Sequence, residues 1–321
     1  MIAWALNRFV RSLSESCDGY RRLMMNRFDH CPICNSKHIM ILSGFEALYI
    51  HKCIDCSFVF DSRIPTEDEL YDHYKQYSYS MLKPCLHPTV ASYNKLLDEL
   101  EQYRQSGNIL DIGCGQGDFL NEARNRGWNV FGCEYSGAAV SLCHDRDISI
   151  QQGALTAEMF HGVQFDVITS FEVIEHINNQ NEHFDLVYKK LRHGGLYFCT
   201  TPNFDALLRF LERDQFPIIC YPEHISFYTK ASLSHIARHH GFTIQKILTT
   251  GIDIGRLKRQ LLKHDADLGR TEKRLFAKAQ TDSFREQVES NKLLGLIKKS
   301  INVVLSVVRK GDTLKGYLVK P

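Results

Sequence analysis

ILDIGCGQGDFL, residues 109–120, is a short apolar segment that runs into a glycine-rich turn and then into a helical pattern. Glycine occupies alternate positions in the turn, at Gly113, Gly115 and Gly117. Without a Cβ atom, glycine lets a ligand approach the main-chain N–H groups closely. The N-terminus of the following helix adds a partial positive charge that suits an anionic group. The stretch therefore predicts a strand, a ligand-binding turn and a helix.

The spacing from Asp111 to Gly117 is D-x-G-x-G-x-G, which differs from the G-x-G-x-x-G of dinucleotide sites. Glycine-rich turns between a strand and a helix also occur in mononucleotide and S-adenosylmethionine sites. WNVFGCE, residues 128–134, predicts a second strand that ends at Glu134, whose carboxylate can accept both hydroxyls of a ribose. FDVITS, residues 165–170, predicts a fourth strand, and FEVIEHI follows it.

Together these features resemble the class I S-adenosylmethionine-dependent methyltransferases, over about residues 105–250. The resemblance implies an α/β fold with a Rossmann-like sheet of seven strands. A βαβ turn with incidental glycines is the alternative interpretation. The turn after the third strand, residues 152–154, would meet the adenine, and Tyr135 would lie near the same ring. The implied cofactor-binding residues are Asp111, Gly113, Gly115, Gly117, Glu134, Tyr135, Ala154 and Ser170.

Strand and helix patterns alternate through the body of the chain. Residues 121–127 and 136–147 read as helices and residues 148–155 as the third strand. This alternation predicts a parallel sheet with helices on both faces. TLKGYLVKP, residues 313–321, reads as a strand, which the resemblance makes the antiparallel seventh strand. We therefore expect residues 254–310 to be a helical insertion before the last strand.

Residues 31–56 contain two C-x2-C pairs separated by eighteen residues. Two such knuckles can close a tetrahedral four-thiolate zinc site. An iron–sulfur cluster would use the same ligands, but the two-knuckle spacing favours zinc. A closed four-cysteine shell has no open position, so we expect the metal to be structural. The predicted ligands are Cys31, Cys34, Cys53 and Cys56.

Four regions are predicted along the chain. These are an N-terminal helix at 1–25, a zinc ribbon at 26–62, a tyrosine-rich lid or helical linker at 63–104, and a methyltransferase domain at 105–321. The first of them lacks the apolar core and cleavage site of a signal peptide, and it either packs on the body or lies at a membrane interface. No apolar run approaches the ~20 residues that span a bilayer.

YPEHISFYT, residues 221–229, follows the fifth predicted strand, at the edge where ligands bind in open α/β sheets. Its Y-x-E-H spacing is similar to that of sugar C-methyltransferases, in which the histidine acts as a base. The resemblance implies that Glu223 orients His224, which takes a proton from the acceptor, with Tyr221 as a third catalytic residue. The alternative is that this element only shapes the pocket.

The same sugar C-methyltransferases place a four-cysteine ribbon and then a tyrosine-rich segment before the methyltransferase domain. Here that segment holds Tyr71, Tyr74, Tyr77 and Tyr79. The resemblance implies a lid over the active site. The alternative is a helix whose tyrosines pack on the body with their phenol tips in water.

Glu172, Glu175 and His176 form an E-x-x-E-H pattern after the fourth strand. The pattern is similar to that of ubiquinone-pathway O-methyltransferases and small-RNA 2′-O-methyltransferases, some of which use Mg²⁺. Two carboxylates and an imidazole can coordinate such a cation, although the set lacks a fourth ligand. In the alternative interpretation the three residues cap and solvate the start of a helix.

The composition is that of an ordinary globular protein, with 44% apolar residues and a net charge of +2. From Gly251 onward there are 16 Lys and Arg and 8 Asp and Glu, so this part carries +8 and the preceding 250 residues carry −6. The basic insertion is therefore a candidate surface for a peripheral membrane contact or a homodimer. Seven of the eleven cysteines are scattered, which is typical of a reducing cytoplasm.

These features predict an S-adenosylmethionine-dependent methyltransferase of a small molecule, with a sugar or nucleotide-linked sugar as the first candidate acceptor. Complete sugar C-methyltransferases carry a further C-terminal domain that this sequence does not contain, so O-methylation is an equal expectation. The alternative function is RNA or protein methylation, with the ribbon and the basic insertion as docking surfaces. The acceptor, the pathway and the oligomeric state stay open.

Overall fold

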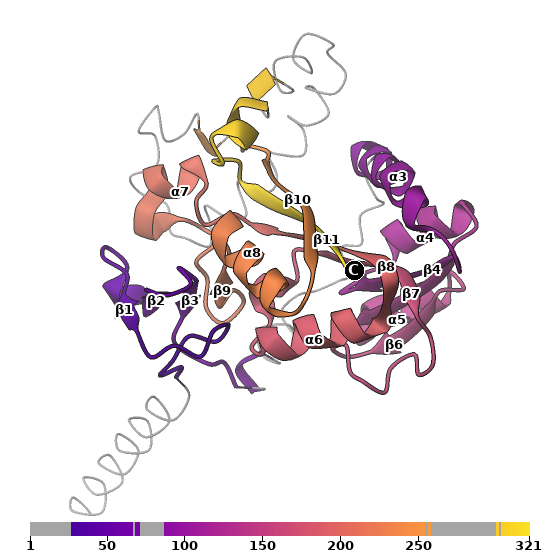
Figure 1. Cartoon of the computed structure of the whole chain (residues 1–321), viewed down its shortest axis with the longest axis horizontal. Coiled ribbons are helices and arrows are strands. Elements are labelled where there is room, and N and C mark those ends of the chain that lie inside the picture. The colour runs from indigo at the N-terminus through magenta and orange to yellow at the C-terminus, as the bar shows by residue number, and fades with distance from the viewer. Residues whose placement is uncertain (1–26, 67, 71–86, 254–255, 258–299, 302) are drawn as a thin grey trace, which may run out of the picture.

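The computed structural model describes residues 27–66, 68–70, 87–253, 256–257, 300–301 and 303–321 (Figure 1). The predicted helix at 1–25, the four tyrosines at 71–79 and most of the predicted insertion lie outside these residues. Within the insertion, residues 300–301 and 303–307 are helical.

The main sheet has seven strands in the order β10-β11-β8-β7-β4-β5-β6. β11 is antiparallel to both of its neighbours, whereas β4 is parallel to β5 and β7. The predicted seven-stranded sheet with an antiparallel last strand is therefore confirmed. Its strands are β4 (Asn108–Ile112), β5 (Asn129–Glu134), β6 (Ser149–Gln152), β7 (Phe165–Phe171), β8 (Leu191–Pro202), β10 (Thr243–Thr250) and β11 (Thr313–Val319).

Helices cover both faces of this sheet, and each face has its own apolar core. One core joins α3 (His87–Leu100), α4 (Asp118–Asn125) and α5 (Gly137–His144) to the sheet. The other joins α6 (Gln180–Lys190) and α8 (Lys230–His239) to it. Successive side chains along a strand point to opposite faces of the sheet, so one strand can contribute to both cores. Further short helices lie between these elements, namely η3 (Glu101–Tyr103), η4 (Ile174–His176), α7 (Leu207–Glu212) and η5 (Arg213–Gln215).

The strand order reverses direction at β4. From this strand the chain proceeds outward through β5 and β6 on one side, and then through β7 and β8 on the other. In open α/β sheets, ligands bind beyond the carboxyl ends of the strands at such a switch point. The glycine turn that follows Ile112 lies there.

A second sheet joins the ribbon to the body that contains the main sheet. The ribbon contributes β1 (Ile39–Ile41), β2 (Ile50–Cys53) and β3 (Val59–Asp61) to this sheet. The fourth strand, β9 (Ser226–Phe227), lies within the segment 221–229 that contains the predicted catalytic residues. The short helix η1 (Glu46–Leu48) connects β1 to β2.

The pairing of β3 with β9 is supported by packing. Val59 lies opposite Phe227, and the N–H of Asp61 donates to the Ile225 carbonyl at 2.9 Å. Phe58 is fully buried, and its ring centroid is 5.1 Å from that of Tyr228. Hydrogen bonds and a shared core thus join the ribbon to the body. Figure 1 shows β3 of the ribbon beside β9.

Candidate functional site

The three glycines of the turn all have positive φ angles, of +67° at Gly113, +55° at Gly115 and +79° at Gly117. They differ in what surrounds them. A Cβ atom added at Gly113 would lie 2.7 Å from Val173, and one at Gly117 would lie 2.5 Å from Ile148. A Cβ at Gly115 would meet no heavy atom of the described chain within 4 Å. Gly113 and Gly117 therefore permit packing, whereas Gly115 faces space that a ligand could fill.

Asp111, at the end of β4, is 2% exposed and accepts a hydrogen bond from Thr169 Oγ1 at 2.7 Å. Burial raises the pKa of Asp111 to about 8. Thr169 was not among the predicted site residues. Thr169 lies directly opposite Asp111 in the parallel pairing of β4 with β7, a register that is not visible in the sequence.

Ser170, which was predicted to bind cofactor, has a fully buried hydroxyl 2.9 Å from the phenol oxygen of Tyr197. The side chain of Tyr197 lies in turn 3.0 Å from His183 Nε2. The Ser170 side chain therefore belongs to a polar cluster within the core that joins the sheet to α6. No contact of this side chain in the described structure bears on its predicted role.

Glu134 connects the second strand to the glycine turn. Its Oε2 accepts a hydrogen bond from the Gly115 N–H at 2.9 Å, and its Oε1 accepts one from the Ser136 N–H at 2.9 Å. Each carboxylate oxygen can accept a further hydrogen bond. Tyr135 is 56% exposed next to it, and Ala154 is also exposed. Four of the predicted cofactor-binding residues, Gly115, Glu134, Tyr135 and Ala154, thus lie at or near one edge of the sheet.

A second group of polar side chains forms beyond β7 and β8. Glu175, His176 and His224 each bring one ligand atom within 4.8 Å of the other two. Glu175 is 1% exposed, its Oε2 accepts from Thr201 Oγ1 at 2.9 Å, and its Oε1 has no hydrogen-bond partner in the described chain. Burial raises the pKa of Glu175.

Backbone carbonyls fix both imidazoles of this group. His176 Nδ1 donates to the Glu223 carbonyl at 2.6 Å, and His224 Nδ1 donates to the Ile218 carbonyl at 2.8 Å. A carbonyl can only accept, so each neutral ring carries its lone pair on Nε2. His176 Nε2 is 4.0 Å from Glu175 Oε1. Two imidazole nitrogens and one carboxylate oxygen therefore lie close enough together that they could hold a metal ion.

This grouping changes the predicted ligand set. Glu172 was expected to join Glu175 and His176, but it is not part of the group, and His224 takes its place. The physical reason is local, because Glu172 has a left-handed backbone with φ of +54° before the tight turn of η4 begins. His224 was predicted as a base and not as a ligand, since a distance between segments 48 residues apart is not visible in the sequence.

The other two predicted catalytic residues have different surroundings. Glu223 is 6% exposed, and its Oε1 is 3.9 Å from His224 Nε2. The hydroxyl of Tyr221 donates to Glu69 at 3.0 Å, and its ring lies 3.9 Å from the guanidinium carbon of Arg63. Tyr221 thus contacts the segment that leaves the ribbon, whereas Glu223 lies beside His224.

The four ribbon cysteines gather in one place. Their sulfur atoms lie within 4.8 Å of one another, with 3.5 Å between Cys31 and Cys56 and 3.6 Å between Cys34 and Cys53. Zinc–sulfur bonds of 2.3 Å at tetrahedral angles place sulfur atoms about 3.8 Å apart. The separations therefore match a four-thiolate zinc site, and three of the four cysteines are buried.

A family model described as a methyltransferase domain matches residues 85–247. Over 101 residues the chain is 36% identical to a ubiquinone biosynthesis O-methyltransferase of Agrobacterium fabrum, covering 30% of this chain and 40% of that protein. Over 146 residues it is 27% identical to a probable S-adenosylmethionine-dependent methyltransferase of Mycolicibacterium smegmatis, covering 44% of this chain and 54% of that protein. The chain thus spans about half or less of the length of these curated relatives.

Among solved structures, the chain is similar to an S-adenosylmethionine-dependent methyltransferase from Archaeoglobus fulgidus. The TM-score is 0.49 and the identity 16%, and the match covers 78% of this chain and 100% of that one. No helix in the described part of the chain is long and apolar enough to cross a membrane.

The buried Asp111 carboxyl predicts a pH-dependent stability. Its pKa is about 8 in the folded protein against an ordinary 3.8, so between these values the folded state holds a proton that the unfolded state has released. The free energy of unfolding should therefore fall as pH rises, by at most about 1.4 kcal/mol per pH unit. Asp111→Asn should flatten this dependence, and urea unfolding at about pH 5 and about pH 8 measures it. Equal pH slopes in the two proteins would contradict the assignment.

Proposed function

Because the chain belongs to the family of methyltransferase domains, we propose that it binds S-adenosylmethionine at the glycine turn and transfers the methyl group to a hydroxyl of a small molecule. The observation that carries the proposal is the open space at Gly115, which lies beside Glu134 and after Asp111. No other glycine of this turn leaves such space in the described chain.

Three contacts are proposed for the cofactor. Glu134 would accept hydrogen bonds from the ribose hydroxyls, since each of its oxygens now accepts only one backbone N–H. Tyr135 and the turn at Ala154 would border the adenine. Transfer is an in-line displacement at the sulfonium methyl, so the protein contributes chiefly the alignment of donor and acceptor.

O-methylation is favoured over C-methylation by the relatives at 30–36% identity that are named as O-methyltransferases. We propose that Glu175, His176 and His224 hold a divalent cation at the acceptor site. A bound cation would supply Lewis acidity that lowers the pKa of an acceptor hydroxyl. In this proposal His224 is a metal ligand and not the predicted free base. Two imidazoles and one carboxylate suit Mn²⁺, Fe²⁺ or Zn²⁺ better than the predicted Mg²⁺.

For the ribbon we propose a structural zinc ion held by the four cysteines. The sulfur separations and the lack of an open coordination position support this role. The strand β9, which begins two residues after His224, pairs with the ribbon strand β3.

The acceptor is tested with radiolabelled S-adenosylmethionine and a panel of hydroxylated aromatics, sugars, nucleotide-linked sugars, RNA and protein. We expect label on the oxygen of one small-molecule class, with one S-adenosylhomocysteine released per methyl transferred. The panel includes nucleotide-linked sugars because the Y-x-E-H segment is similar to that of sugar C-methyltransferases. Label found on carbon, or only on RNA or protein, would contradict the proposal.

Two glycine variants separate cofactor binding from folding. Gly115→Ala should weaken S-adenosylmethionine binding at least about tenfold, because its Cβ would enter the ligand space, and cost about 1–2 kcal/mol of stability for the left-handed backbone. Gly117→Ala should lose the same backbone term and, because its Cβ would clash with Ile148, roughly 1–3 kcal/mol more of the free energy of unfolding. Calorimetric titration and urea unfolding measure the two quantities. The cofactor site is misplaced if Gly115→Ala binds normally.

Metal content separates the two proposed metal sites. We expect two divalent ions per chain when the protein is purified and then supplied with Mn²⁺. Cys56→Ser should lose zinc alone and His176→Asn the second ion alone, so each variant serves as the control for the other. Elemental analysis counts the ions. A His176→Asn protein that still binds Mn²⁺, or a chelated enzyme with full turnover, would return His224 to the role of a base.

A further inference from the structure

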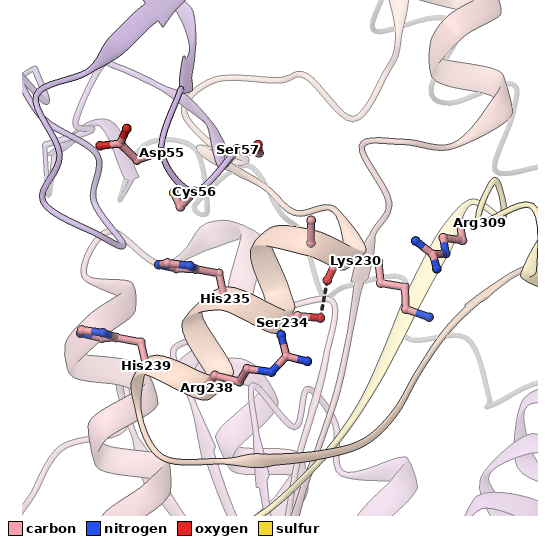
Figure 2. Close-up of a pocket in the computed structure, with 10 residues that line it drawn as sticks. Asp55, Cys56, Ser57, Lys230, Ser234, His235, Arg238, His239 and Arg309 are labelled. Atoms are coloured by element: carbon pink, nitrogen blue, oxygen red, sulfur yellow. Dashed lines mark hydrogen bonds between the residues drawn. The ribbon is translucent and has the colours of Figure 1, made fainter.

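A hollow of about 610 Å³ lies between the ribbon and the methyltransferase body. It is bordered by Asp55, Cys56 and Ser57 of the second knuckle, by α8, and by Arg309 before β11 (Figure 2). None of the residues proposed above for the cofactor or the acceptor lines it. It is therefore a different place from the glycine turn.

Basic side chains dominate this hollow. Lys230, Ser234 and Arg238 recur every fourth residue on α8 and so lie along one stripe of the helix. His235 and His239 form the neighbouring stripe. Figure 2 shows Lys230 and Arg238 directed toward the side from which Arg309 approaches.

No acidic side chain of the described residues compensates the positive charge in the hollow. Asp55 is the only acid among its described lining residues. The Asp55 carboxylate accepts from Ser36 Oγ at 2.5 Å and lies 3.4 Å from His38, so it is engaged within the ribbon. Lys230, Arg238 and Arg309 form no ion pair with another described residue. Like charges gathered without a counter-charge repel one another, and an anion relieves that repulsion.

Arg309 occupies this position at a conformational cost. Its φ is +60°, in the region that favours glycine, and an L-residue there costs about 1–2 kcal/mol. Asn203 Nδ2 holds the strained segment by donating to the carbonyls of Arg309 at 3.4 Å and Gly311 at 2.7 Å. An arginine retained in a strained backbone conformation indicates that its positive charge has a functional role.

We propose that this hollow binds the diphosphate group of a phosphorylated small molecule. Arg238 and Arg309 each present the planar fork that pairs with phosphate oxygens, and Lys230 adds a third positive charge. No Phe, Tyr or Trp occurs among the described lining residues, whereas single-stranded nucleic acid is bound by aromatic stacking platforms. The described lining thus favours a compact phosphate-bearing ligand over a single strand of nucleic acid.

Binding of inorganic pyrophosphate to the full chain, measured by titration calorimetry with saturating S-adenosylhomocysteine, tests the proposal. We expect one site per chain, and at least tenfold weaker binding in Arg309→Gly and in Arg238→Ala, because a hydrogen bond to a charged group contributes about 1.5–3 kcal/mol. Arg309→Gly should at the same time keep or raise the thermal midpoint, since glycine accepts the left-handed backbone. A purely structural role for Arg309 would not produce this pair of effects.

Arg213→Gly is the matched control, because Arg213 is an exposed arginine with φ of +51° outside the hollow. It should bind pyrophosphate as the unaltered protein does. ADP distinguishes the ligand sources: equal affinity supports recognition of the diphosphate alone, and tighter binding supports a nucleotide. The proposal is overturned by absent binding, by equal weakening in Arg213→Gly, or by a uridine oligomer that binds more tightly through Arg238 and Arg309.

Discussion

The parallel hydrogen bonding of β4 with β5 and β7 is the constraint on which the rest of the site depends. It makes three strands end at one edge, with Asp111 opposite Thr169 and Glu134 beside the glycine turn. Since strand ends fix where the following segments begin, the same pairing places the turn of η4 over that edge. Asp111 and Thr169, 58 positions apart in the chain, therefore become neighbours.

The group beyond β8 is positioned by main-chain atoms. The carbonyls of Ile218 and Glu223 set the tautomers of His224 and His176, and both belong to the loop that contains His224 itself. A side-chain acceptor for these imidazole N–H groups could be removed by one substitution, whereas a backbone carbonyl is present whatever the residue. The geometry is thus tied to the path of residues 218–225, which the pairing of β9 with the ribbon holds in place.

Local patterns in the sequence were sufficient for the fold and for part of the site. Alternating strand and helix periods predicted the sheet, and TLKGYLVKP was correctly assigned as its antiparallel strand. The four cysteines gather as their spacing predicted. Contacts between distant segments were not accessible in this way. The joining of His224 to Glu175, the use of residues 226–227 as a ribbon strand, and the meeting of Arg309 with α8 each depend on how the chain returns on itself.

The two-residue strand β9 has a consequence for how this protein could change over evolutionary time. Ribbons of this size are often regarded as separable domains that a chain can gain or lose. Here β9, which begins two residues after His224, is the fourth strand of the ribbon's sheet. Phe58 and Phe60 of the ribbon belong to the same core as Tyr228. Removing the ribbon would leave β9 unpaired and would open the core around Tyr228. We therefore expect the ribbon and the body to be kept, exchanged or lost together, as one folding unit.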